Sequence, residues 1–138
     1  MKKLTTKAAA VAAAAAIAVS GVLVSASPAA AATYGGECGS GYKVVNEDNV
    51  GSKGTVYLTY NSSTGRNCVV TKRHSPGSAV VIEAGLSVSP AGNHWAAYEG
   101  GSFTSYAGPV YLNAAGKCVD WMGRIGGTEG GERGTNCG

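Results

Sequence analysis

The segment GTVYLTY at residues 54–60 has the alternating pattern of a β-strand. Successive side chains of a strand point to opposite faces of its sheet, so Val56 and Leu58 share one face while Tyr57 and Thr59 share the other. β-Branched and aromatic residues also favour strands. We therefore expect a strand here, with the face that carries Val56 and Leu58 turned towards a hydrophobic core.

A second copy of this phrase lies 54 residues further along, where residues 108–112 read GPVYL. Val110 and Leu112 take the inward positions, and Tyr111 takes the place of Tyr57. A turn and then Cys-Val follow both copies, so we interpret each copy as a β-hairpin whose second strand begins at a cysteine. Two explanations stay open. One is duplication of a half-domain. The other, which we favour because the two turns differ in length, is that two hairpins solve the same packing problem alike.

The rest of the chain after residue 32 consists of similar short runs rich in Val, Tyr, Thr and Ile, separated by Gly, Asn and Ser. Of the 22 glycines, 21 lie in this part, which argues against long helices. The pattern predicts an all-β domain, a small disulfide-linked antiparallel β-sandwich or barrel. The expected strands lie near residues 42–46, 55–60, 67–72, 79–84, 95–98, 103–106, 110–113 and 117–122. Residues 123–138 carry almost no apolar side chains and are expected to form a mobile loop.

Residues 1–32 have the three parts of a secretory signal peptide: a lysine-rich start, an uncharged apolar run and an alanine-rich end. Cleavage is expected before Thr33, with the Ala29/Ala30 region as a second choice. No twin-arginine pair is present, which favours general secretion. We therefore divide the chain into a signal peptide at 1–32 and a single β domain at 33–138, and we expect this domain to be secreted to the cell exterior.

Removal of the signal peptide changes the charge of the protein. Three of the 11 Lys and Arg residues lie within residues 1–32, and the eight that remain match the eight Asp and Glu residues of the chain. The exported protein is therefore formally neutral. Neutrality gives no reason to propose a nucleic acid or, after signal cleavage, a membrane as a partner.

Four cysteines, an even number, lie in the exported part, and this predicts two disulfides. Their spacings do not resemble those of zinc ligands. In a meander the first and third strands run parallel, so Cys38 before the first strand lies near Cys68 at the start of the third. We therefore favour Cys38–Cys68 and Cys118–Cys137. Loop entropy alone does not select this pairing, because the alternatives close longer loops.

Catalytic and metal-binding patterns are not recognised. His74 and His94 stand outside any metal-ligand spacing. Glu83, Glu99 and Asp120 could be imagined as acid pairs of a glycoside hydrolase, but no spacing singles them out. We expect no enzymatic activity, no metal and no cofactor.

Aromatic side chains are the suggestive class. Trp95, Tyr98, Tyr57 and Tyr111 are candidates for a flat binding surface on which sugar rings could stack, with Trp95 and Tyr98 on an exposed rim. The alternative, which we favour, is that such side chains fill the core or form cross-strand pairs. Trp121 is expected in the core because it shares a strand face with an apolar neighbour.

One loop has the features of a protease inhibitor. The segment TKRHSPGS at residues 71–78 is basic and contains a proline, and Lys72 or Arg73 would be the residue that enters the specificity pocket of a trypsin-like protease.

The ordered set of motifs resembles the spore-associated protein A family of filamentous actinomycetes. The motifs are YGGECGSGY, GTVYLTY, TGRNCVVT, SPGSAV, YAGPVYL, AAGKCV and NCG, in chain order from residue 34 to residue 138. The resemblance implies a small exported protein found with spores or aerial growth, without an established enzymatic activity and without catalytic residues to transfer. It favours a non-enzymatic protein whose partner is the spore or cell-wall surface. The alternative is a secreted glycan-binding module or a hydrolase or protease inhibitor.

The signal-peptide assignment makes a prediction about processing. The exported protein is expected to begin at Thr33, or within about three residues of it, and to lack four hydrogens because both disulfides are formed. Intact-mass spectrometry of the protein recovered from the medium or the cell surface measures both quantities. A full-length chain retained in the membrane fraction would contradict the assignment.

Overall fold

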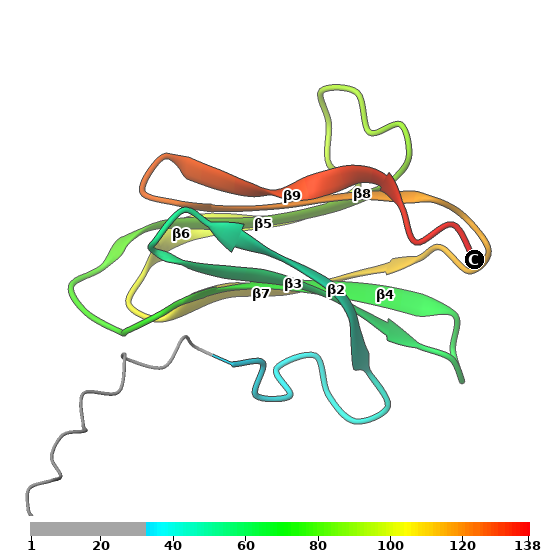
Figure 1. Cartoon of the computed structure of the whole chain (residues 1–138), viewed down its shortest axis with the longest axis horizontal. Coiled ribbons are helices and arrows are strands. Elements are labelled where there is room, and N and C mark those ends of the chain that lie inside the picture. The colour runs from blue at the N-terminus through cyan, green and yellow to red at the C-terminus, as the bar shows by residue number, and fades with distance from the viewer. Residues whose placement is uncertain (1–32) are drawn as a thin grey trace, which may run out of the picture. The chain divides into compact units, whose positions relative to one another are not determined.

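The computed structural model describes residues 33–138, which form two four-stranded antiparallel sheets packed face to face (Figure 1). The expected all-β fold with two disulfides is confirmed, and of the two expected architectures it is the sandwich. The signal peptide assigned to residues 1–32 lies outside the described residues. Residues 33–138 contain no helix with the length and hydropathy of a membrane span.

Residues 33–138 contribute four strands to each sheet. The first sheet has the order β2-β3-β4-β7, with β2 at Lys43–Val50, β3 at Gly54–Asn61, β4 at Arg66–Arg73 and β7 at Tyr106–Asn113. The second has the order β6-β5-β8-β9, with β5 at Val80–Val88, β6 at Ala97–Phe103, β8 at Val119–Ile125 and β9 at Thr128–Thr135. Every pairing between neighbouring strands is antiparallel.

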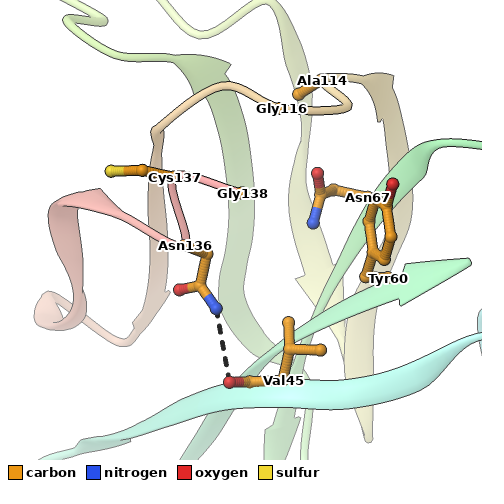
Figure 2. A pocket seen from close by; sticks show the side chains of 8 residues that line it. All are labelled: Val45, Tyr60, Asn67, Ala114, Gly116, Asn136, Cys137 and Gly138. Carbon is orange, nitrogen blue, oxygen red and sulfur yellow. Dashed lines mark hydrogen bonds between the residues drawn. The ribbon is translucent and has the colours of Figure 1, made fainter. Parts of the chain in front are cut away.

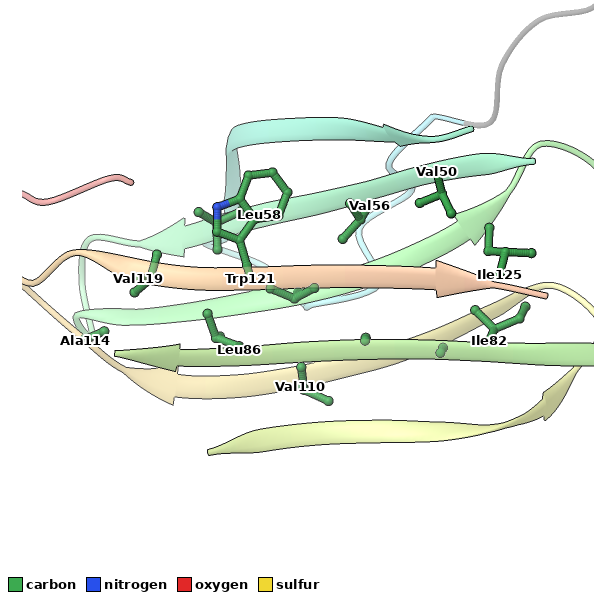
Figure 3. Close-up of a cluster of buried hydrophobic side chains, with 13 residues drawn as sticks. Val50, Val56, Leu58, Ile82, Leu86, Val110, Ala114, Val119, Trp121 and Ile125 are labelled. Atoms are coloured by element: carbon green, nitrogen blue, oxygen red, sulfur yellow. The ribbon is translucent and has the colours of Figure 1, made fainter. Parts of the chain in front are cut away.

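The hydrophobic core lies between the two sheets (Figure 3). Val56 and Leu58 of β3 face it, as their alternation predicts, and belong to the same buried cluster as Ile82 and Leu86 of β5. Trp121 of β8 is fully buried, which confirms its predicted place. Its indole Nε1 donates a hydrogen bond of 2.8 Å to the Thr135 hydroxyl, so burial leaves this donor satisfied.

Both disulfides join the cysteines that strand geometry favours. Cys38 is bonded to Cys68, which fastens the segment before β2 to the outer face of β4. Cys118 is bonded to Cys137, which fastens the end of the chain after β9 to the start of β8. Each bridge removes roughly 3–4 kcal/mol of loop entropy from the unfolded state.

Carboxylates connect the edge strands of the two sheets. The edge strands β2 and β9 lie beside each other, and the Gly131 N–H of β9 donates to Asp48 Oδ2 of β2 at 2.8 Å. At the opposite side, the Gly108 N–H of β7 donates to Glu99 Oε1 of β6 at 2.6 Å. Edge strands expose unpaired backbone groups, so a carboxylate from the other sheet satisfies a donor that the ladder leaves open.

One strand prediction and one loop prediction are wrong. Residues 103–106 do not form a strand of their own, because Phe103 ends β6, Tyr106 begins β7, and residues 104–105 form the bend between them. Residues 123–138, expected to be a mobile loop, contain the end of β8 and all of β9. A Cβ at Gly130 would collide with the Asn49 carbonyl oxygen and one at Gly131 with the Trp121 carbonyl oxygen, so close backbone approach requires glycine in this strand.

The second copy of the repeated phrase is also not a hairpin. β3 and β4 form one, but β7 pairs with β4, while the following strand β8 belongs to the other sheet. The turn after Asn113 therefore carries the chain from one sheet to the other.

The buried tryptophan generates a stability prediction. Trp121→Ala is expected to cost about 3–5 kcal/mol of unfolding free energy, because it leaves a cavity between the sheets. Trp121→Phe retains most of the ring volume and loses the bond to Thr135, so its loss should be smaller. Tyr98→Ala, at an exposed position, is the surface control. Chemical denaturation with intact disulfides measures all three, and equal losses for Trp121→Ala and Tyr98→Ala would contradict the core assignment.

Candidate functional site

The four aromatic residues proposed as one binding surface are divided between two faces. Tyr57 and Tyr111 lie on the outer face of the first sheet, where they pack in the contacts described next. Trp95 and Tyr98 lie on the outer face of the second sheet, beside Gly85 and Glu83 of β5. The core separates these faces, so the predicted common surface does not exist. Strand alternation shows which residues share a face of one sheet but not which sheet a strand joins.

The outer face of the first sheet is covered by residues 34–42. The Tyr34 ring lies 5.9 Å from the Tyr57 ring, and the Tyr42 ring lies 5.6 Å from the Tyr111 ring. The Tyr111 hydroxyl donates to the Cys38 carbonyl oxygen at 2.9 Å. Tyr57 is only 5% exposed. These tyrosines therefore bind a segment of their own chain, and their role is structural.

Trp95 is half-buried rather than fully exposed on a rim. A Cβ at Gly85 would come within 2.8 Å of the indole ring, so the tryptophan lies directly on the backbone of β5. The Arg133 guanidinium lies 4.8 Å from the ring centroid, within the range of a cation–π contact. The protein itself therefore occupies part of the ring surface that a sugar would need.

Tyr98 is exposed, as predicted, with 51% of its surface accessible. Its hydroxyl donates to Glu83 Oε1 at 2.7 Å, and this bond, followed by burial and the carboxylate charge, raises the pKa of Tyr98. Arg124 joins Glu83 at 3.0 Å and Glu129 at 3.1 Å. The exposed part of this face is thus a tyrosine beside a row of alternating charges, whose ion pairs add little stability because water screens them.

Asp120 organises the loop that carries Trp95. The carboxylate is 2% exposed, and it accepts hydrogen bonds from the N–H groups of Ala91 and Gly134, both at 2.8 Å. Arg133 Nη1 lies 3.3 Å from Oδ2. Burial by itself would raise the pKa of Asp120, but the Ala91 N–H, the Ser89 hydroxyl, the Gly134 N–H and Arg133 together lower it below its ordinary value of 3.8.

The three carboxylates considered as hydrolase acids all have structural partners. Glu83 binds Arg124 and Tyr98, Glu99 accepts the Gly108 N–H, and Asp120 holds two backbone donors. Within residues 33–138 no group of three His, Cys, Asp or Glu side chains has the geometry of a metal site.

Lys72 and Arg73 do not lie in an exposed loop. Both belong to β4, where Lys72 pairs with Thr55 and Tyr106 on the two neighbouring strands. Lys72 Nζ forms a 2.6 Å ion pair with Glu37, and Arg73 Nη1 donates to the Ser78 and Thr104 carbonyl oxygens at 2.8 and 3.1 Å. An inhibitory residue must project from an extended loop into the protease, so this assignment is wrong for both.

A pocket of about 530 Å³ opens at the end of the sandwich where β4 begins (Figure 2). Its lining comes from the first sheet, the turn after β7 and the last residues of the chain: Val45, Tyr60, Asn67, Ala114, Gly116, Asn136, Cys137 and Gly138. Asn67 is buried and donates to the Thr59 carbonyl oxygen at 3.1 Å. The volume suits a small molecule, and the lining is mainly apolar with amide groups at its rim.

Sequence reasoning missed this pocket because it depends on two local irregularities. β2 has a bulge between Val44 and Asn46, which places Val45 at the rim. Asn136 has a φ of 55°, and its amide bonds to the Val45 carbonyl oxygen and to Asn46 (Figure 2 shows the first of these). Asparagine tolerates this left-handed conformation better than most residues. An asparagine at position 136 was therefore the signal in the sequence for an irregular backbone here.

The fold and these sites define a small, disulfide-linked β-sandwich protein whose polar side chains mostly serve its own structure. No family model matches the chain, and no solved structure matches it either. Over 125 residues the chain is 49% identical to Spore-associated protein A of Streptomyces coelicolor, an alignment that covers 86% of this chain and 80% of that protein. The chain therefore belongs to the spore-associated protein A family.

The buried carboxylate predicts a specific pH dependence. A lowered pKa in the folded state means that Asp120 contributes stability above its ordinary pKa of 3.8, and that this contribution is lost as the pH falls through the folded value. Asp120→Asn should cost about 1–3 kcal/mol near neutral pH, because one amide cannot replace both acceptor oxygens. The difference from the wild type should shrink on acidification below about pH 4.

Denaturant unfolding at several pH values tests this. Glu47→Gln is the matched control, since Glu47 is exposed and its replacement should cost little unfolding free energy at neutral pH. A stability gap between wild type and Asp120→Asn that is constant from neutral to acidic pH would refute the role of the ionised carboxylate.

Proposed function

We propose that this protein is exported, has no enzymatic activity and associates with the surface of the spore or of the cell wall. The observation that carries the proposal is its 49% identity to a protein named for spore association, over most of both chains. The signal-peptide pattern of residues 1–32 and the two disulfides support export, because disulfides persist mainly in oxidising compartments.

The positions of the polar residues support a role other than catalysis. Catalytic acids and bases need a partner on the substrate, whereas Glu83, Glu99 and Asp120 are bonded to groups of this chain. The two disulfides tie both terminal segments of residues 33–138 to strands. A domain fastened in this way suits persistence outside the cell.

Ring stacking on a glycan is the less favoured mode of attachment. Trp95 lies on Gly85 and beneath Arg133, and Tyr98 is bonded to Glu83, so neither ring is a free aromatic platform. Attachment to walls or spores through the whole protein surface does not need such a platform. Protease inhibition is not favoured either, because Lys72 and Arg73 are held within β4.

Cell fractionation tests the proposal. The protein, traced with an antibody among cytoplasm, medium, vegetative wall and spores, is expected on the spore or wall fraction and should be accessible to added protease. A variant lacking residues 1–32 is the control and should stay in the cytoplasm. Wild-type protein found only in the cytoplasm, or only free in the medium, would overturn the proposal.

Attachment can be tested separately with purified walls and spores. Trp95→Ala and Tyr98→Ala are expected to bind them nearly as well as the wild type does, with the fold checked by circular dichroism. A large loss of binding by either folded variant would replace this proposal with a carbohydrate-binding module.

A further inference from the structure

A second pocket, of about 420 Å³, lies at the opposite end of the sandwich from the pocket of Figure 2. Three connections meet there: the β2–β3 turn, the segment that follows β4, and the β8–β9 turn. The lining residues are Ser52, Lys53, Arg73, His74, Ser75, Val80, Ile125 and Gly126. These three connections lie together at the end of the sandwich that is away from the C-terminus (Figure 1).

The charged residues of this pocket are all basic. Lys53 and Arg73 line it together with the imidazole of His74, and no carboxylate among residues 33–138 does. Among residues 33–138 none of the three takes part in an ion pair, although four ion pairs form elsewhere in the same residues. Positive charge therefore gathers at one end of a domain that is formally neutral.

The hydrogen bonds of these cations leave donors available. Lys53 Nζ makes long bonds of 3.4 and 3.3 Å to the Ile125 and Gly126 carbonyl oxygens. Arg73 bonds two carbonyl oxygens through Nη1, so its other terminal nitrogen keeps its donors. Carbonyl oxygens orient both side chains without neutralising them.

His74 gives an independent indication. Its Nε2 is buried and has no hydrogen-bond partner within the described part of the chain. A buried polar atom without a partner costs free energy, and such atoms in a native structure call for an explanation. Because Nε2 is buried, it does not face the pocket directly, and rotation of the imidazole towards the pocket that His74 already lines would let an oxygen atom of a bound group supply the missing partner.

The pocket is also held in shape before any ligand arrives. The His74 N–H donates to the Lys53 carbonyl oxygen at 2.9 Å, which joins the first two connections. The Gly126 N–H donates to the Val81 carbonyl oxygen at 2.8 Å, which joins the third to β5. Fixed donors lower the entropy that binding would otherwise cost.

We propose that this pocket binds a phosphate group. A phosphate presents several acceptor oxygens and up to two negative charges, which matches an ammonium, a guanidinium and an imidazole with the Ser52 and Ser75 hydroxyls at hand. The pocket is larger than one phosphate, so the group would be carried on a small molecule or on the end of a polymer. Phosphate binding is a property separate from surface association. A negative binding experiment would overturn this proposal and leave the proposed function standing.

Isothermal titration and amide chemical-shift mapping of the purified protein test the proposal. The probes are inorganic phosphate, a hexose phosphate and the uncharged hexose, at constant ionic strength. Both phosphates are expected to bind and to shift the amides of residues 52–53, 74–75 and 126, while the uncharged hexose leaves them unmoved. If the hexose phosphate binds more tightly than inorganic phosphate, the site recognises a phosphate carried on a larger molecule. If the two affinities are equal, the site recognises the phosphate group alone.

Variants provide the decisive comparison. Lys53→Gln and His74→Gln should each weaken phosphate binding about tenfold, the typical loss for one charge-assisted hydrogen bond. Arg73 is left intact because it also holds the Ser78 and Thr104 carbonyl oxygens. Lys43→Gln removes an exposed lysine from the far end of β2 and should leave the affinity unchanged. Absence of binding by the wild type, or equal losses in Lys43→Gln and Lys53→Gln, would overturn the proposal.

Discussion

Carboxylates that accept backbone N–H groups hold the open sides of this sandwich together. A two-sheet sandwich has four edge strands, and each presents donors that no neighbouring strand satisfies. Asp48 connects β2 to β9, and Glu99 connects β6 to β7. Asp120 binds donors on both sides of β8, one in the loop after β5 and one in β9. Hydrogen bonds to a charged acceptor are stronger than neutral ones, so a few acids supplement a modest apolar core.

This use of acids decides where charge remains. The exported part has equal numbers of acidic and basic residues, and neutrality argues against a strong overall field. Neutrality does not argue against a local field. An acid that accepts a backbone N–H lies where the fold puts that donor, whether or not a basic residue is near. Lys53 and Arg73 are bonded to carbonyl oxygens instead of carboxylates. A net charge read from a sequence therefore says little about individual pockets.

The sequence predicts those features of the fold that depend on local alternation. The strand containing Val56 and Leu58, the buried Trp121 and the all-β class follow from side chains that alternate every second residue. β9 could not be predicted from alternation. Gly130 and Gly131 lie so close to neighbouring backbones that no side chain fits there, so the strand carries no apolar pattern to recognise. The candidate sites could not be predicted from the sequence for a different reason. The lining of each pocket comes from connections distant in sequence, and their meeting depends on which sheet every strand joins.

The repeated phrase has its explanation in the first sheet. β3 and β7 flank β4, so Tyr57 pairs with Val70 and Tyr111 with Cys68 on the same outer face. Residues 34–42 lie across this face: Tyr34 meets Tyr57, Cys38 is bonded to Cys68, and Tyr42 meets Tyr111. Both copies thus place aliphatic side chains in the core and a tyrosine under the same segment. Duplication of a half-domain would require matching partners after each copy, but β4 and β8 lie in different sheets. The two copies are alike because they perform the same packing on either side of one strand.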